Sequence, residues 1–537
     1  MKTLPVGTQT FSIIRENDYL YVDKTKYILK MIKDGRINFL SRPRRFGKSL
    51  LISTLEELYK GNKDLFKGLY IYDKWNWNET YPVIKLDLSK VKNLNSIELE
   101  GRLKEIIYNI GINYSIKLVN ETSQGMFDSL ILELYRKFNK RVVVLIDEYD
   151  TPLNDNLEDI EIFKDNRRAL QELYGLLKSN DEYIQFIFIT GVSKIGSTSI
   201  FSKLNSPSDL TLVDDYANIC GYTHDEIEKY LHEHIKCMAK KENVSYEKMM
   251  DKINYWYDGY SWNGKTRLFN PFSVMSMLKD KDFSEYWFST GTTTFLMNKI
   301  KENNNLTPII EPTAYYKDDL LKFEVENTNI IALLFQTGYL TIKEIKKDFD
   351  GDNEYYLYFP NREVKNGFGK DLLNSYTNYA NGDLNYLKKK IMKEIYSLDS
   401  NGLTESFEFL LSRIPYKLHV KTESYYHSVI LSWLLAYGFE LKGEDPTSDG
   451  RIDAIMERND FVVITEFKYS HDIKNKDGDI TTKAKSIDTL FNDAFKQIYK
   501  KKYYKKYYNK DKIILLAVAI SNKQISTKFE VFKGESL

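Results

Sequence analysis

A short motif near the N-terminus, Gly47-Lys48-Ser49, most constrains how this chain of 537 residues can fold. It follows an apolar stretch at 37–40 that predicts a buried strand, and a helical pattern begins near Gly47. Three further apolar stretches, separated by helical patterns, lie at 83–88, 142–146 and 186–190. Strands that alternate with helices predict a parallel α/β sheet, and strands that are apolar on both faces predict a sheet covered on both sides.

The motif matches the end of a P-loop, whose pattern is G-x-x-x-x-G-K-S/T between a strand and a helix. Backbone N–H groups at such a helix N-terminus bind phosphates. We therefore expect Gly47 to lie against the phosphates, Lys48 to reach the β- and γ-phosphates, and Ser49 to hold Mg²⁺.

The loop departs from the P-loop pattern at its start, because Arg42 stands where the first glycine belongs. The substitution makes the loop stiff and strongly cationic. Arg44, Arg45 and Phe46 are expected to take part in nucleotide binding. For the two arginines, action in trans on a neighbouring molecule and a solvated basic loop are the alternatives.

The other half of a nucleotide site is predicted at Asp147-Glu148, at the end of the apolar stretch 142–146. This is a Walker B arrangement, in which Asp147 holds Mg²⁺ through water and Glu148 positions the attacking water. Thr190, at the end of the next strand, is a candidate sensor of the γ-phosphate, and an ordinary strand-ending turn is the alternative. Together the motifs predict a site that binds ATP and Mg²⁺ and hydrolyses ATP.

A second candidate site lies near the C-terminus, at Asp453, Glu466 and Lys468. In the predicted strand 461–468, the period of two places Glu466 and Lys468 on one face. Asp453 belongs to a predicted neighbouring strand at 451–456. Two carboxylates on adjacent strands can share a divalent cation, and an ammonium beside them can orient or deprotonate a water.

Two helical residues extend this second site. Glu423, on a predicted helix at 423–437, is a candidate third metal ligand, and Gln497, on a predicted helix at 485–508, is a candidate for orienting a phosphate or a water. Oxygen ligands favour Mg²⁺, with Mn²⁺ as the second choice. The set predicts metal-dependent cleavage of DNA or RNA phosphodiesters, and a surface strand pair with charged residues is the alternative.

Length and net charge limit the number of domains and the kind of nucleic-acid binding that we expect. A chain of this length exceeds one core, and we expect a P-loop domain at 1–215, a helical or winged middle region at 216–400 and a nuclease-like domain at 401–537. The net charge is +1, so nucleic-acid binding requires a local patch. The Lys- and Tyr-rich segment 500–512 is a candidate, although we favour tyrosines packed on the sheet and solvated lysines.

The same composition predicts a cytoplasmic location. The chain has two cysteines, no apolar segment at its N-terminus and no apolar run of membrane-spanning length, which predicts a reducing compartment without a signal peptide or membrane contact. The oligomeric state stays open, and a homo-oligomer is compatible with the sequence.

Several blocks resemble a family from bacteria and archaea that joins an AAA-ATPase-like domain to a PD-(D/E)XK nuclease domain. Besides the Asp453, Glu466 and Lys468 set, the matching blocks are 4–7, 21–25, 42–49, 145–150, 257–260 and 270–273. The replaced first glycine is similar to the family's own pattern. The resemblance implies a P-loop NTPase fold followed by a restriction-endonuclease-like fold, and it leaves the substrate and the roles of 257–260 and 270–273 open.

The leading hypothesis is an ATP-regulated, Mg²⁺-dependent nuclease that acts on DNA or RNA, in defence against mobile elements or phage. The alternative is a nucleotide-dependent switch or scaffold whose nuclease-like domain only binds a partner. A motor that moves along nucleic acid is disfavoured, because no helicase motif accompanies the two Walker-like motifs.

Overall fold

The structure is a computed structural model that forms two compact units. It describes residues 1–91, 95–194, 200–204, 207–287, 294–303, 309, 313–321, 329–376, 381–412, 423–436, 441–442, 454–457, 460–474, 480–522 and 524–532. The first unit comprises Met1–Thr290 and Ala314–Glu363, and the second comprises Gly291–Thr313 and Val364–Leu537. The division into 1–215, 216–400 and 401–537 stays a prediction.

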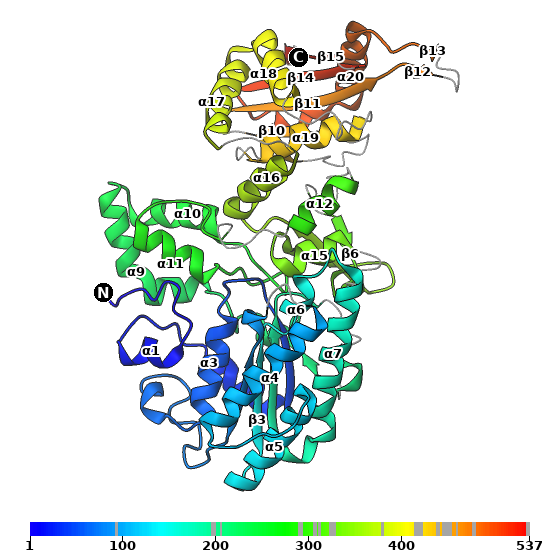
Figure 1. The fold of residues 1–537 in the computed structure, drawn as a ribbon. Coiled ribbons are helices and arrows are strands. Elements are labelled where there is room, and N and C mark those ends of the chain that lie inside the picture. Colours follow the sequence, from blue (N-terminus) through cyan, green and yellow to red (C-terminus); the bar gives the residue numbers. More distant parts are fainter. Residues whose placement is uncertain are drawn as a thin grey trace. The chain divides into compact units, whose positions relative to one another are not determined.

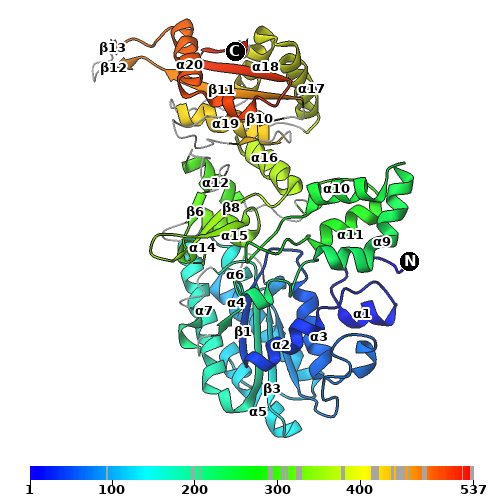
Figure 2. The ribbon, with the colours of Figure 1, turned by 180° about the vertical axis from the view of Figure 1, so that it is seen from behind.

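The first unit is built on a five-stranded parallel sheet; the sequence predicts a parallel sheet and four of its strands, and the short fifth strand is β5. In spatial order its strands are β2 (Val83–Asp87), β3 (Val142–Asp147), β4 (Ile184–Gly191), β1 (Ile37–Ser41) and β5 (Ser208–Asp209). Figures 1 and 2 show helices on both faces, with α3 (Lys48–Tyr59) on one and α4 (Ser96–Asn113), α5 (Ser123–Phe138) and α7 (Ile160–Ser179) on the other. Every residue of β3 is buried, as two covered faces require.

The strand order brings the two nucleotide motifs to one edge of the sheet. β1 and β3 lie on either side of β4, and all three run parallel. Their carboxyl ends therefore meet at the same edge, where ligands bind in open α/β sheets. This edge carries the loop after β1 and Asp147 at the end of β3.

Shorter elements complete the sheet-bearing unit. Around the sheet lie α1 (Phe11–Glu16), α2 (Thr25–Asp34), α6 (Thr151–Asn154) and the short 3-10 helices η1 to η5. Three helices, α9 (His224–Lys241), α10 (Tyr246–Tyr257) and α11 (Pro271–Asp280), share an apolar core with Leu20 and Val22. A three-stranded sheet follows, in the order β6 (Thr313–Tyr315), β8 (Asn353–Tyr358) and β7 (Thr341–Lys347), with α14 (Lys317–Leu321) and α15 (Ile330–Thr337) beside it.

The second unit contains a mixed five-stranded sheet. Its spatial order is β15 (Gln524–Val531), β14 (Lys512–Ser521), β11 (Phe461–Ser470), β10 (Ala454–Glu457) and β9 (Leu441–Lys442). β11 and β14 are parallel, and the other neighbours are antiparallel. The remaining elements are α12 (Thr294–Asn303), α16 (Arg362–Tyr376), which begins at the junction, α17 (Asn381–Ser397), α18 (Ser400–Ser412), α19 (Glu423–Ala436), the hairpin β12 (Ile473–Lys474) and β13 (Ile480–Thr482), and α20 (Ile487–Lys501).

The Lys- and Tyr-rich segment agrees in part with the favoured alternative, since three of its tyrosines are buried whereas Tyr499 and Tyr508 are exposed. α20 packs on β11 and β14, and it ends at Lys501 because Lys502 turns into the left-handed region, with φ of 51°. A 3-10 helix, Tyr503–Tyr507, follows in place of the longer helix expected from the sequence. Tyr503, Tyr504 and Tyr507 are buried in the core beneath α20, whereas the lysines at 500, 502, 505 and 506 are exposed.

Candidate nucleotide and nuclease sites

The loop from Arg42 to Gly47 leaves β1 and enters α3. Its left-handed positions are Arg45, with φ of 66°, and Gly47, with φ of 93°. Gly47 is the N-cap of α3, where a residue with a Cβ would be strained by the positive φ. Arg45 carries that strain, which is typical of loops that must present a particular set of backbone groups.

The carbonyl oxygens of the loop are bound by donors from the protein. Lys48 Nζ donates to the carbonyls of Arg42 and Pro43, at 2.9 and 3.0 Å. Trp287 Nε1 donates to the carbonyl of Arg44 at 3.1 Å. These carbonyl oxygens therefore accept hydrogen bonds from within the protein and do not face a bound anion.

The N–H groups of the second half of the loop are open. The carbonyl of Phe46 accepts from the backbone N–H of Gly221 at 3.2 Å. In the part of the chain that the structure describes, the backbone N–H groups of Phe46, Gly47, Lys48 and Ser49 donate no hydrogen bond. All four residues line one pocket. A row of open N–H groups at a helix N-terminus is the arrangement that binds phosphate.

Lys48 is buried beside three acids. Burial lowers the pKa of its ammonium, and Glu148, Asp147 and Asp150 are the nearby charges that oppose this effect. Glu148 lines the same pocket, and its carboxylate accepts from the Thr151 hydroxyl at 3.2 Å. Asp150 instead binds the segment just after β4, accepting from the N–H of Ser193 at 2.6 Å.

Asp147 has the surroundings that a Mg²⁺ ligand requires. Burial raises the pKa of its carboxyl group to about 6, against the lowering effects of the Ser49 hydroxyl and of Lys48. Its Oδ1 atom is buried and has no hydrogen-bond partner among the residues that are described. A buried carboxylate oxygen without a donor, next to the P-loop serine, fits an oxygen-seeking cation. Asp147 and Ser49 are therefore the residues that would hold Mg²⁺.

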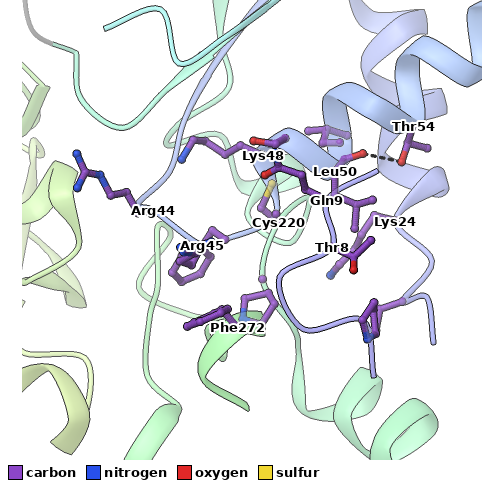
Figure 3. Close-up of a pocket in the computed structure, with 18 of the residues that line it drawn as sticks. Thr8, Gln9, Lys24, Arg44, Arg45, Lys48, Leu50, Thr54, Cys220 and Phe272 are labelled. Carbon is purple, nitrogen blue, oxygen red and sulfur yellow. Dashed lines mark hydrogen bonds between the residues drawn. The ribbon is translucent and has the colours of Figure 1, made fainter. Parts of the chain in front are cut away.

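The pocket beside the loop has a volume of about 430 Å³. The loop forms one wall, and the segments 5–9, 20–24 and 219–222 and the start of α11 form the others. Cys220 lies in the wall close to Lys48 (Figure 3). The cavity therefore extends past the phosphate loop and leaves room for the nucleoside part of a nucleotide.

The two loop arginines lie differently. The guanidinium of Arg45 lies 4.8 Å from the ring centre of Phe272, which also lines the pocket (Figure 3). Asn270 caps α11 by accepting from the N–H groups of Phe272 and Ser273, which satisfies two backbone donors of the first turn. Arg44 points away from the other labelled residues in Figure 3.

Thr190 is fully buried in β4. Its hydroxyl donates to the carbonyl of Leu40 in β1 at 2.7 Å, and its carbonyl accepts from the N–H of Tyr149 at 3.1 Å. In this arrangement the hydroxyl links β4 to β1, and a role in sensing the γ-phosphate stays a prediction.

The block 257–260, which had no role in the sequence, packs against the loop. The ring of Phe46 is buried edge-on against Tyr260 and Trp262, with centroids 4.7 and 5.1 Å away. Gly259 has a φ of 120°, and a Cβ there would lie 2.1 Å from the carbonyl oxygen of Pro360. The block therefore supports the loop from behind. Only the resemblance marked it in the sequence, because its contacts join distant segments.

In the second unit, Glu466 and Lys468 share one face of β11, as the alternation predicts. Lys468 Nζ donates to Glu466 Oε1 at 2.7 Å. The Glu466 side chain is 1% exposed and that of Lys468 is 23% exposed, so the pair lies at the boundary of the core. Their neighbours on the parallel strand β14 are Ala517 and Ala519, which are fully buried in the apolar core with α20.

The other predicted residues of this site are only partly described. Asp453 and the side chain of Glu423 lie outside the described residues. Gln497 lies on α20, one helical turn after Asp493. Asp493 is close enough to Lys468 for that ammonium, after Lys485, to lower the pKa of its carboxyl group, which makes Asp493 a nearby acid that sequence reasoning missed. The described side chains contain no group of three metal-binding residues.

The sheet order and the two motif-bearing strand ends define a protein with a P-loop nucleoside-triphosphatase fold and a separate mixed-sheet unit. A family model for a predicted AAA-ATPase matches residues 5–201, and one for the PD-(D/E)XK nuclease superfamily matches residues 421–530. The chain is 36% identical over 482 residues to the "Uncharacterized protein in vnfD 5'region" of Azotobacter chroococcum mcd 1, covering 87% of this chain and 89% of that protein. The chain belongs to the family that joins a predicted AAA-ATPase domain to a PD-(D/E)XK nuclease domain. None of the described helices is long and apolar enough to cross a membrane.

Proposed function

We propose that this chain binds and hydrolyses ATP with Mg²⁺ at the loop after β1, and cleaves DNA or RNA with a divalent metal at β11. The observation that supports the nucleotide site most strongly is the hydrogen bonding of the loop backbone. Its carbonyls accept from Lys48, Trp287 and Gly221, whereas the N–H groups from Phe46 to Ser49 stay open at the pocket.

In the proposed nucleotide site, each group has one role. The open N–H groups and Lys48 bind the phosphate oxygens, and Ser49 and Asp147 would hold Mg²⁺. Bound there, the ion supplies charge neutralisation on the β- and γ-phosphates. Glu148, which lines the same pocket and lies close enough to Lys48 to affect the pKa of that ammonium, orients the water for attack.

The nuclease half rests on the buried pair of Glu466 and Lys468, together with the match to the nuclease superfamily. Glu466, Asp453 and Glu423 are the proposed metal ligands, and Lys468 orients the attacking water. Gln497 is proposed to orient the substrate phosphate. A metal bound there stabilises the charge that develops on the phosphate.

The nucleotide half is tested by Glu148→Gln. This variant keeps its binding groups, so ATP affinity measured by titration calorimetry should stay within about twofold, whereas ATP turnover should fall by roughly 100-fold or more because the water loses its orienting base. Glu158→Gln, an exposed residue nearby, is the control. Equal turnover in the two variants would remove Glu148 from the mechanism.

The nuclease half is tested by cleavage of single- and double-stranded DNA and RNA with Mg²⁺ or Mn²⁺, with and without ATP. Asp453→Ala should abolish cleavage and leave ATP affinity unchanged. Asp460→Ala, which removes an exposed acid just before β11, is the control and should cut like the wild type. Metal-dependent cutting that survives in Asp453→Ala would sink this assignment, and an absence of cutting by the wild type would favour the switch or scaffold.

A further inference from the structure

The residue that departs from the P-loop pattern, Arg42, is fully buried. Glycine is needed where the backbone adopts a positive φ, and the positive φ values of this loop belong to Arg45 and Gly47, not to Arg42. The backbone at position 42 therefore does not require glycine. The question is what a buried guanidinium does behind a phosphate loop.

The guanidinium of Arg42 binds three carbonyl oxygens. One Nη atom donates to the carbonyls of Ser41 and Thr211, each at 2.9 Å, and the other donates to the carbonyl of Tyr216 at 3.2 Å. Ser41 ends β1, whereas Thr211 and Tyr216 belong to the segment after β5. One side chain thus fastens the start of the loop to a segment about 170 residues away in the chain.

The face of the same guanidinium lies on an aromatic ring. Its carbon is 4.2 Å from the ring centre of Trp262. The Trp262 ring also packs edge-on against Phe46, near the end of the loop, at 5.1 Å. Arg42 at the start and Phe46 near the end therefore rest on one indole, which fixes the span of the loop between them.

The backbone of Arg42 connects this support to the phosphate side. Its carbonyl accepts from Lys48 Nζ at 2.9 Å, and its N–H donates to the carbonyl of Gly191 at the end of β4 at 3.3 Å. A shift of residue 42 would therefore move the ammonium that is proposed to bind phosphate.

We propose that Arg42 is a positioning residue for the phosphate loop. Its guanidinium sets the position of the Arg42 carbonyl, and that carbonyl sets the position of Lys48 and, through the loop, of the open N–H groups from Phe46 to Ser49. The proposal rests on the nucleotide-binding function proposed above. It predicts that glycine, the residue of the ordinary P-loop, is the wrong residue at this position.

The test compares Arg42→Gly and Arg42→Lys in the full chain, by the Kd for Mg·ATP from titration calorimetry. Arg42→Gly restores the P-loop pattern but should weaken binding by roughly tenfold or more, because three buried carbonyls lose their donor. Arg42→Lys keeps the charge but has no planar fork, so its Kd should lie between those of the wild type and Arg42→Gly.

Leu103→Ala is the control for a general loss of stability. Leu103 is buried in α4 and does not line the pocket. At a matched fall in Tm, this variant should bind Mg·ATP within about twofold of the wild type, since its cavity lies away from the loop. Arg42→Gly that binds as tightly as the wild type, or no more weakly than Leu103→Ala at the same loss of Tm, overturns the proposal. A wild-type chain that binds no ATP instead overturns the proposed function on which it rests.

Discussion

The two candidate sites hold their lysines in different ways. Lys48 donates to the neutral carbonyls of Arg42 and Pro43, whereas Lys468 donates to the carboxylate of Glu466 at 2.7 Å. A cation held by carbonyl dipoles keeps its net charge, but a cation paired with a carboxylate does not. The first lysine is therefore arranged to meet an anion such as a phosphate. The pair of Lys468 and Glu466 carries no net charge by itself, so a divalent metal needs further carboxylates, such as those predicted at Asp453 and Glu423.

The buried acids of the two units also differ in their partners. Glu466 has an ammonium within hydrogen-bond distance, whereas Asp147 and Glu363 accept from hydroxyl or backbone N–H groups. Burial raises the pKa of Asp147 to about 6 and that of Glu363 to about 8. Without an ammonium at hydrogen-bond distance, these two buried carboxyl groups keep their proton to a higher pH than an exposed acid does.

The largest effect should come from removing each lysine in turn. Lys48→Ala should weaken Mg·ATP binding by roughly 100-fold, because phosphate loses its cation and the carbonyls of Arg42 and Pro43 lose their donor. Nucleotide-independent cutting should stay unchanged, because Lys48 has no part in the proposed nuclease site. Lys468→Ala should slow cutting by roughly 100-fold or more and leave the Kd for ATP unchanged. Calorimetry and a cleavage assay on both variants separate the two sites.

The control for Lys48 is Lys60→Ala, an exposed residue just after α3. The control for Lys468 is Lys512→Ala, which lies at the far end of the neighbouring strand β14. If Lys468→Ala lost ATP binding as well, the two sites would not be chemically separate and the comparison would fail.

The sequence predicted those parts of both sites that depend on local pattern. The parallel strands, the helix start at Lys48 and the strand end at Asp147 follow from apolar runs bounded by motifs. The shared face of Glu466 and Lys468 follows from the period of a strand. The stretch 18–23 shows where local pattern fails. Its residues alternate between polar and apolar, which is typical of a strand, but the segment forms no strand in the structure. Leu20 and Val22 pack into the core of α9, α10 and α11.

The supports of the phosphate loop could not be predicted, because they join distant segments. Trp287 donates to the carbonyl of Arg44 across 243 residues. Phe46 rests on Tyr260 and Trp262 in the same way. A block such as 257–260 carries no local signal for these contacts, since its packing partner is fixed only when the chain folds.

The next largest effect concerns the stability of the first unit. Glu363 has an ordinary pKa of 4.5 in the unfolded chain and about 8 in the folded one. Its burial is the main cause, and the N–H of Trp287 donates to it at 2.7 Å. Between these values the unfolded state ionises first, so the free energy of unfolding should fall as pH rises from 4.5 to 8, by on the order of a few kcal/mol.

Glu363→Gln cannot ionise, so its Tm should fall less than that of the wild type between pH 5 and pH 8. Thermal unfolding of both chains across this range is the measurement. Parallel pH profiles of Tm would mean that Glu363 is charged in the folded chain. Glu363 would then not be an example of a buried acid that stays protonated for lack of an ammonium partner.

A smaller effect is expected from the protonation of Asp147. The carboxylate, not the neutral acid, binds Mg²⁺, so the Kd for Mg·ATP should rise by roughly tenfold per pH unit below pH 6, where the folded pKa lies. The Kd for ATP measured in the presence of EDTA, without Mg²⁺, should not rise in this way as the pH falls. Asp147→Asn should lose the pH dependence and should raise the Tm of the metal-free chain, because it removes a buried ionisable group. A Kd that is flat from pH 7 to pH 5 in the wild type would show that Asp147 is not a Mg²⁺ ligand.

The smallest effect should come from the ring beneath Arg45. Phe272→Leu keeps an apolar side chain in the pocket wall but removes the aromatic face that holds the guanidinium at 4.8 Å. A cation–π contact of this kind contributes about 0.5–1 kcal/mol, so the Kd for Mg·ATP should rise by roughly two- to fivefold. Phe283→Leu is a matched control, because Lys252 lies 4.1 Å from that ring and Phe283 does not line the pocket. A rise in Kd for Phe272→Leu alone would make Arg45 a second loop cation that, like Lys48, is held without a carboxylate so that phosphate can bind it. Equal Kd values in both variants would instead leave Lys48 as the main cation of the site.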